Sequence, residues 1–126
     1  MNILTMRISM DSGGQLSYVL LSMDPSERIN QPNYIKQLPG DFAAIAAIAA
    51  TARDRVGRAL QANSEVMMMS IGTELASDVM PDGLREQLLK STAEMLYLDL
   101  EEALIHLPWE CIRLNDRQWL GSRFVV

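Results

Sequence analysis

The first 23 residues alternate between two faces, and this pattern restricts the start of the chain to a β-hairpin. Over residues 2–10 one face carries Leu4, Met6, Ile8 and Met10, and the other carries Ile3, Thr5, Arg7 and Ser9. A period of two is that of a half-buried strand. Residues 11–15 include Gly13 and Gly14, which tolerate the positive φ of a tight turn. Because residues 16–23 are again apolar, the sequence predicts an antiparallel hairpin.

Three helices are predicted after the hairpin, in residues 41–63, 66–79 and 82–90. Asp41 is a suitable N-cap for the first helix, whose apolar stripe consists of Ile45, Ile48, Ala52, Val56 and Leu60. The second helix has a face formed by Met68, Ile71, Leu75 and Val79. It also contains Gly72. Glycine lowers helix stability, and close packing against a neighbour would explain its presence there. The Met67-Met68-Met69 triplet favours core filling over a soft binding surface.

The remaining segments predict a long loop and several short strands. Residues 24–39 contain three prolines and predict a loop, which either binds a partner or only crosses the surface. Residues 94–100 and 103–107 are apolar and predict two strands joined by Glu101 and Glu102. A turn is predicted at 115–118, and a final strand after residue 119. Residues 1–126 therefore form one α+β domain or subdomain: a β-hairpin, two to three helices, then short strands around a Pro-Trp-Glu corner.

Charge and composition exclude several classes of partner. The net charge of −5 argues against nonspecific binding to nucleic acid or to an anionic membrane. The most apolar run, residues 42–50, is shorter than the roughly 20 residues that cross a bilayer. The first ten residues do not have the pattern of a signal peptide. A single cysteine suits a reducing compartment. We therefore predict a cytoplasmic protein without nucleic-acid or membrane partners.

His106 and Cys111 are the only histidine and the only cysteine, and they are candidates for a catalytic pair. Nucleophilic catalysis needs both side chains within hydrogen-bond reach, together with donors for an oxyanion. Here Pro108 separates a predicted strand from a predicted turn, and no glycine-rich segment flanks Cys111. One histidine and one cysteine also cannot complete a zinc site. The sequence therefore predicts no catalytic residue, no metal site and no cofactor in this chain.

The tripeptide between them, Pro108-Trp109-Glu110, favours a structural role. Pro108 suits the first position of a helical turn. Trp109 offers a large apolar area with one donor that needs a partner. Glu110, at the start of the turn, is expected to meet free N–H groups. We predict that the three residues brace a corner between a strand and a helical turn.

The run "LYLDLEEALIHLPWECIRLNDRQWLGSRFVV" resembles the opening part of CHAT domains, which are caspase-like (clan CD) cysteine peptidase relatives. The likeness follows a strand, the Pro-Trp-Glu corner, a polar turn at 115–118, the pair Trp119-Leu120 and a strand from residue 123. Upstream, Gly72, Leu75, Pro81 and Leu84 fit the pattern of the preceding segment, so the likeness covers about residues 70–126.

This resemblance implies a function for the whole protein and none for His106 or Cys111. In CHAT peptidases the catalytic His and Cys lie downstream of the Pro-Trp-Glu corner, so neither residue here matches them. The chain would be the non-catalytic N-terminal portion of a caspase-like cysteine endopeptidase, or of an inactive relative. Its partner would be the rest of the caspase-like domain. The family also suggests a bacterial protein with a role in immunity or programmed cell death.

Two other functions remain open from the sequence. One is a stand-alone α+β interaction or regulatory module, which binds a protein partner through the 24–39 loop or by strand addition. The other is a small cysteine hydrolase that uses Cys111 and His106. The apolar residues 124–126 end without a turn, so we expect the natural chain to continue beyond them.

Overall fold

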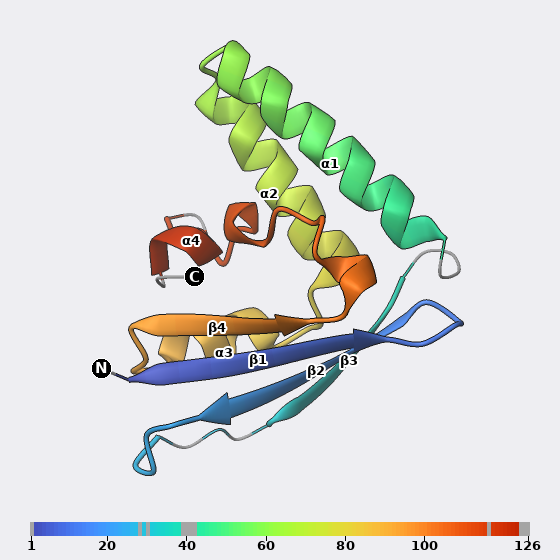
Figure 1. Ribbon diagram of the computed structural model, residues 1–126. Coiled ribbons are helices and arrows are strands. Elements are labelled where there is room, and N and C mark those ends of the chain that lie inside the picture. Colours follow the sequence, from blue (N-terminus) through green and yellow to red (C-terminus); the bar gives the residue numbers. More distant parts are fainter. Residues whose placement is uncertain (1, 28, 30, 39–42, 116, 124–126) are drawn as a thin grey trace.

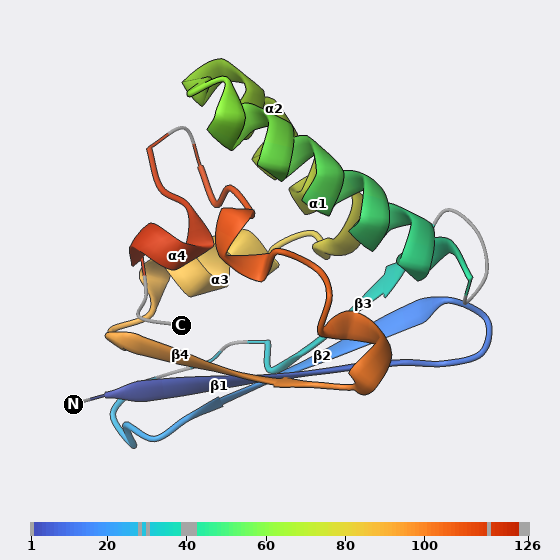
Figure 2. The same ribbon diagram turned by 45° about the horizontal axis from the view of Figure 1, so that its top comes forward.

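The computed structural model describes residues 2–27, 29, 31–38, 43–115 and 117–123. It shows a four-stranded mixed sheet with the helices on one side (Figures 1 and 2). The predicted α+β class is therefore confirmed.

The sheet has the strand order β3-β2-β1-β4. Strands β1 (Ile3–Met10) and β2 (Gln15–Ser22) form the predicted antiparallel hairpin, and Gly14 takes a positive φ of 80° in its turn. Strand β3 (Asn33–Gln37) extends the sheet antiparallel to β2. Strand β4 (Met95–Leu100) pairs in parallel with β1, at the opposite edge. The long connection from β3 to β4 carries the helices.

Three helices lie where the sequence predicts them. They are α1 (Ala44–Gln61), α2 (Glu65–Val79) and α3 (Leu84–Lys90). Ser64 caps α2, since its hydroxyl oxygen accepts a hydrogen bond from the Met67 N–H at 3.2 Å. Asp41, the predicted cap of α1, lies outside the described residues. The N-cap position is held by Ala43, whose methyl side chain makes no capping hydrogen bond.

The core lies between the sheet and the helices. The face of β1 that carries Leu4, Met6, Ile8 and Met10 is buried, as are Leu16, Tyr18 and Leu20 of β2. The helical layer contributes a further set of buried residues: Ile71, Leu75 and Val79 from α2, and Leu84 and Leu88 from α3. The apolar face of the sheet and the apolar faces of the helices thus pack together in one core.

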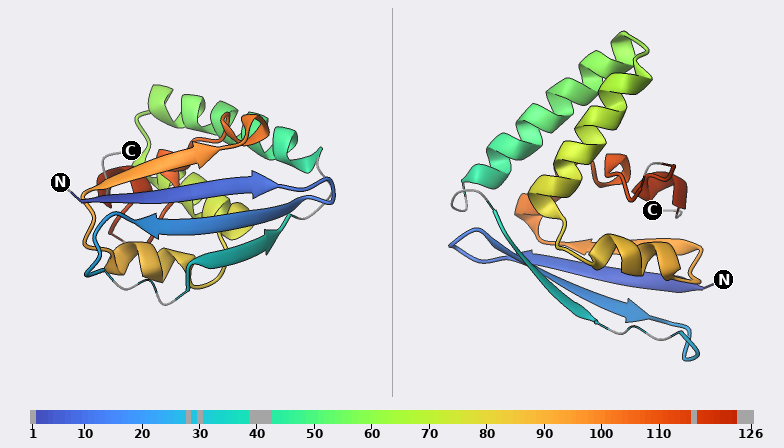
Figure 3. Two further views of the ribbon diagram at one scale, coloured as in Figure 1. Left: turned by 60° about the horizontal axis from the view of Figure 1, so that its bottom comes forward. Right: turned by 180° about the vertical axis from the view of Figure 1, so that it is seen from behind.

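No described helix or strand covers the opposite face of the sheet (Figure 3, left). Its exposed apolar side chains are Leu21, Ile35 and Tyr97, with exposed fractions of 50%, 63% and 59%. We call these three residues the open sheet face. Arg7 and Asp99 form an ion pair at 2.9 Å on neighbouring strands of the same face.

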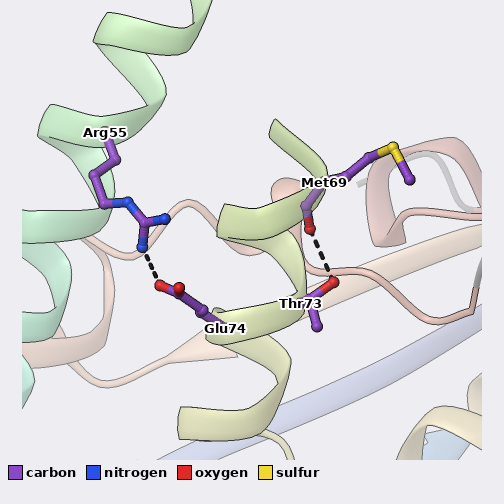
Figure 4. Close-up of polar contacts among 4 residues, drawn as sticks. All are labelled: Arg55, Met69, Thr73 and Glu74. Carbon is purple, nitrogen blue, oxygen red and sulfur yellow. Dashed lines mark hydrogen bonds and ion pairs between the residues drawn. The ribbon is translucent and has the colours of Figure 1, made fainter. Parts of the chain in front are cut away.

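The helices α1 and α2 form a hairpin that projects away from the sheet (Figure 1; Figure 3, right). Arg55 of α1 forms an ion pair with Glu74 of α2 (Figure 4). At the far end, Leu60 is 68% exposed and Val66 is 77% exposed. The apolar stripe predicted for α1 is therefore buried near the sheet and bare at the tip.

The methionine triplet does not act as core filling throughout. Met68 is half-buried and packs against the core, whereas Met67 is exposed and Met69 is half-buried outside the core. The reason is the projection of the hairpin, because these residues lie in the first turns of α2, close to the tip.

Two predicted elements are wrong within the described residues. The segment 24–39 is not entirely loop, since it contains β3, where Tyr34 is buried between two exposed neighbours. Residues 103–107 do not form a strand; Glu102–Leu104 form a 3₁₀ turn, η1. Leu104 and Leu107 are both buried. Their spacing of three residues fits a helical turn and conflicts with the alternation of a strand.

The predicted final strand is also corrected where the structure describes it. Residues Leu120–Arg123 form a short helix, α4, which Leu120 starts by donating its N–H to the Ile112 carbonyl at 2.8 Å. The fully buried Leu120 side chain anchors this turn in the core. Residues 124–126, the rest of the predicted strand, lie outside the described residues.

Candidate functional site

Trp109 stands at the centre of the corner, in a second 3₁₀ turn, η2 (Trp109–Cys111), that follows Pro108. Its side chain is only 2% exposed. The indole Nε1–H donates to the Leu104 carbonyl of η1 at 2.9 Å, so its one polar group is satisfied. The ring meets the Tyr18 ring edge-on, with centroids 6.5 Å apart and planes at 74°. Trp109 therefore joins η2 to η1 and to the sheet.

Tyr18 continues this connection into the helical layer, and the sequence alone did not single it out. Its hydroxyl donates to the Val79 carbonyl at the end of α2. Burial raises the pKa of Tyr18 far above its usual value of 10.0, so the hydroxyl stays protonated and acts as a donor. Its position on the inner face of β2 was a signal, since a buried tyrosine hydroxyl needs a partner.

Glu110 contributes through its backbone and Cβ. Its side chain is exposed, and no hydrogen bond among the described residues joins its carboxylate to the N–H groups of η2. Gly121 of α4 packs directly on it, because a Cβ at Gly121 would lie 2.9 Å from the Glu110 Cβ and 3.1 Å from its carbonyl oxygen. The corner thus supports α4 by close backbone packing.

The segment after the corner is also held against α2. The N–H of Arg113 donates to the Gly72 carbonyl at 3.3 Å. A Cβ at Gly72 would lie 2.5 Å from the Cys111 carbonyl oxygen and 2.7 Å from both Arg113 Cγ and Trp119 Cζ3. Glycine is therefore required there for the helix and the segment to touch, and the predicted close packing of Gly72 is confirmed.

His106 and Cys111 are not brought into one site. His106 is exposed and lines a hollow beside α1 with Ala103, whereas Cys111 lines a different hollow below the tip of the helical hairpin. Burial raises the pKa of the Cys111 thiol, and the nearby Glu110 carboxylate raises it further. An activated nucleophile requires the opposite shift. The arrangement offers no basis for a hydrolase mechanism that uses Cys111 as nucleophile and His106 as base.

We expect Cys111 to react slowly with iodoacetamide in the folded chain, because a raised pKa lowers the thiolate fraction at neutral pH. Alkylation rates measured against pH should reach half their maximum above the ordinary thiol value of about 8.5. The chain unfolded in urea is the control and should show the ordinary midpoint. A folded-state midpoint below that of the unfolded chain would contradict the description of Cys111 as an unactivated thiol.

The hollow that contains Cys111 separates the helical hairpin from the corner. It has a volume of about 480 Å³. Its walls are the turn between α1 and α2, the start of α2 and the segment around the corner: Ala59, Leu60, Asn63, Ser64, Glu65, Met68, Glu110, Cys111 and Trp119. The wall thus combines apolar side chains and one aromatic ring with the polar or acidic residues Asn63, Ser64, Glu65 and Glu110.

Within the described residues, no group of three or more His, Cys, Asp or Glu side chains is placed to hold a metal ion. No described helix is both long and apolar enough to span a membrane. Comparison with protein-family models, with curated proteins and with solved structures gave no significant match for this chain.

Proposed function

We propose that the chain is the non-catalytic N-terminal portion of a CHAT-type caspase-like cysteine peptidase. In this role it packs against and supports the catalytic core that carries the His/Cys pair. The observation that carries the proposal is the apolar surface left bare at the tip of the α1–α2 hairpin. We define this hairpin-tip surface as Leu60, Val66, Met67 and Met68 together with Trp119.

The hairpin-tip surface has the character of a docking surface. Single exposed apolar residues are common on proteins, but here Leu60, Met68 and Trp119 share one hollow. Full burial of one such aliphatic side chain typically contributes about 1.5–3 kcal/mol. A partner that covers Leu60 and Val66 would therefore gain several such contributions at once. A hollow that combines apolar walls with a few polar groups is also the usual form of a binding site.

The position of this surface suits a core that follows the corner in the chain. Glu110, Cys111 and Trp119 form one wall of the hollow, and α4 follows directly after Trp119. In Figures 1 and 2, α4 lies on the helical side of the sheet, and it packs on Glu110 of η2. A domain continuing from α4 would begin next to the hairpin-tip surface and could cover it without a long linker.

The proposal also includes the setting of the protein. The partner is the remainder of the caspase-like domain, and the compartment is the cytoplasm, which the single cysteine and the net charge of −5 both suit. The chain itself supplies no catalytic residue, metal or cofactor in this proposal. His106 and Cys111 remain outside the chemistry.

A second candidate function is a stand-alone interaction module that binds another protein. The open sheet face favours it, because Leu21, Ile35 and Tyr97 are exposed on the same face of the sheet, on β2, β3 and β4. Strand addition at β4 is a second way to bind, since β4 forms an edge of the sheet. This candidate would use the side of the sheet opposite to the hairpin-tip surface.

The two candidate functions place the main exposed apolar surface of the isolated 126-residue chain differently. The N-terminal support predicts the hairpin-tip surface, and the interaction module predicts the open sheet face. We expect the chain to bind the dye 8-anilinonaphthalene-1-sulfonate, which reports exposed hydrophobic surface. The double variant Leu60→Ser/Val66→Ser should lose about half or more of that fluorescence and should remain folded, because both side chains are exposed. The matched control is Leu21→Ser/Tyr97→Ser on the open sheet face.

A larger loss in the control variant would favour the interaction module over the N-terminal support. Absence of dye binding, in a chain that is monomeric and unfolds cooperatively, would contradict the proposed packing surface. Circular dichroism of each variant shows whether the fold is kept, so a loss of fluorescence can be assigned to the surface.

A further inference from the structure

A small hollow beside α2 is lined by two basic side chains and, among the described residues, by no acidic one. It has a volume of about 100 Å³ and is lined by Thr73, Arg85, Arg113 and Asn115. These residues come from α2, from α3 and from the segment after the corner. The hollow is distinct from the one that contains Cys111, and its lining shares no residue with it.

Arg113 is held firmly in this hollow. Its N–H is bonded to the Gly72 carbonyl, and its backbone forms an antiparallel bridge with Trp119. The guanidinium carbon lies over the Trp119 ring, 5.5 Å from its centroid. The ring thus helps to hold the guanidinium, whose N–H groups lie along its planar edge. That edge carries the N–H groups that bind anions.

The edge of Arg113 is incompletely satisfied. Its Nε is buried and has no hydrogen-bond partner among the described residues. Buried donors are almost always paired, and a buried donor on a charged group is especially costly to leave unpaired. Arg113 thus combines an unpaired buried donor with a side chain that lines the hollow.

The other described side chains that line the hollow are polar and carry no carboxylate. The Oδ1 atom of Asn115 accepts from the N–H groups of Arg117 and Gln118, both at 2.8 Å, which leaves its Nδ2 group to donate. The Thr73 hydroxyl donates to the Met69 carbonyl at 2.8 Å, so its hydrogen is already used (Figure 4). Thr73 thus forms a wall of the hollow.

Arg85 brings a second positive charge to the same place. It is exposed on α3 and has no ion pair among the described residues. Arg7, Arg55 and Arg58, by contrast, each pair with a carboxylate. In a chain with a net charge of −5, two arginines that line one hollow with no carboxylate among its described lining residues form a local positive site.

We propose that this hollow binds a small oxyanion, either a carboxylate or a phosphate group. The guanidinium groups of Arg113 and Arg85 and the Nδ2 of Asn115 are its donors. A guanidinium edge matches the paired oxygens of both groups. At about 100 Å³ the hollow is well below the roughly 300–1,000 Å³ of sites for whole small molecules. It takes a single anionic group, free in solution or at the end of a larger molecule.

The test titrates the ¹⁵N-labelled chain with sodium phosphate and, separately, with sodium acetate. Sodium chloride at matched ionic strength is the reference. We expect saturable shifts in the amide signals of Arg113 and Asn115 and in the indole N–H signal of Trp119. Saturation by acetate alone identifies a carboxylate site, and saturation by phosphate alone identifies a phosphate site. Either result supports the proposal.

Two variants and one control assign the binding to the arginines. Arg113→Lys keeps the positive charge and loses the planar guanidinium, which can bind two oxygens at once. Arg85→Gln removes an exposed charge without disturbing the core. Each variant should weaken anion binding about tenfold. Arg53→Gln, an exposed arginine on α1, should bind as the unchanged chain does. The proposal is overturned if neither anion gives shifts beyond those of chloride, or if Arg85→Gln and Arg113→Lys bind as tightly as Arg53→Gln.

Discussion

Replacing Trp109 with alanine is expected to lower the free energy of unfolding by about 3–5 kcal/mol, the usual cost of truncating a buried large aromatic residue. The change removes a fully packed ring, its edge-on contact with Tyr18 and the hydrogen bond to the Leu104 carbonyl. Domains of this size are typically stable by only about 5–15 kcal/mol. Urea denaturation followed by circular dichroism measures the difference.

Two further variants separate the parts of this effect. Trp109→Phe keeps an aromatic ring and removes the indole N–H bond to the Leu104 carbonyl, which then retains only its longer bond from the Leu107 N–H, so it should cost less than alanine, about 1–3 kcal/mol. Tyr97→Ala truncates an exposed aromatic residue and should cost no more than about 1 kcal/mol. If Trp109→Ala costs no more than Tyr97→Ala, the corner is not the brace described above.

Alanine substitution at two helical glycines is expected to change stability in opposite directions. Gly72→Ala should destabilise the chain by about 1–3 kcal/mol, the usual cost of overpacking. The new Cβ would meet a carbonyl oxygen at 2.5 Å, and the backbone cannot move away without separating α2 from the corner. This penalty outweighs the gain in helix propensity of about 1 kcal/mol that alanine offers.

Gly57→Ala is the matched control. Gly57 lies within α1, and a Cβ there would have no atom within 4 Å. Only the propensity gain remains, so this variant should be more stable by up to about 1 kcal/mol. The same urea denaturation measures both variants. If Gly72→Ala and Gly57→Ala are stabilised alike, α2 and the segment after the corner are not in the close contact that the structure shows.

The hairpin and the three helices could be predicted because their signals are local. The alternation in residues 2–10 and the spacing of Ile71, Leu75 and Val79 each lie within one element. β3 was missed because a five-residue edge strand has a single buried residue, Tyr34, to mark it. The 3₁₀ turn at Glu102–Leu104 was missed because a short apolar run fits a strand and a helical turn equally well.

The corner was predictable in kind and not in its contacts. Proline, tryptophan and glutamate in sequence indicate a turn with a buried ring, but the partners of Trp109 depend on tertiary packing. Tyr18 lies far from Trp109 in the chain, and neither segment contains a sequence signal that predicts contact with the other. The oxyanion hollow is of the same kind, since Arg85 and Arg113 come together only when α3 and the corner pack on α2.

Sequencing the transcript beyond the codon for Val126 tests the proposed function most directly. If the chain is the N-terminal portion of a caspase-like peptidase, the reading frame continues into further hydrophobic strands. A histidine and a cysteine then follow, each directly after one of these strands. A stop codon directly after Val126 would contradict this account and would leave the stand-alone interaction module as the better description.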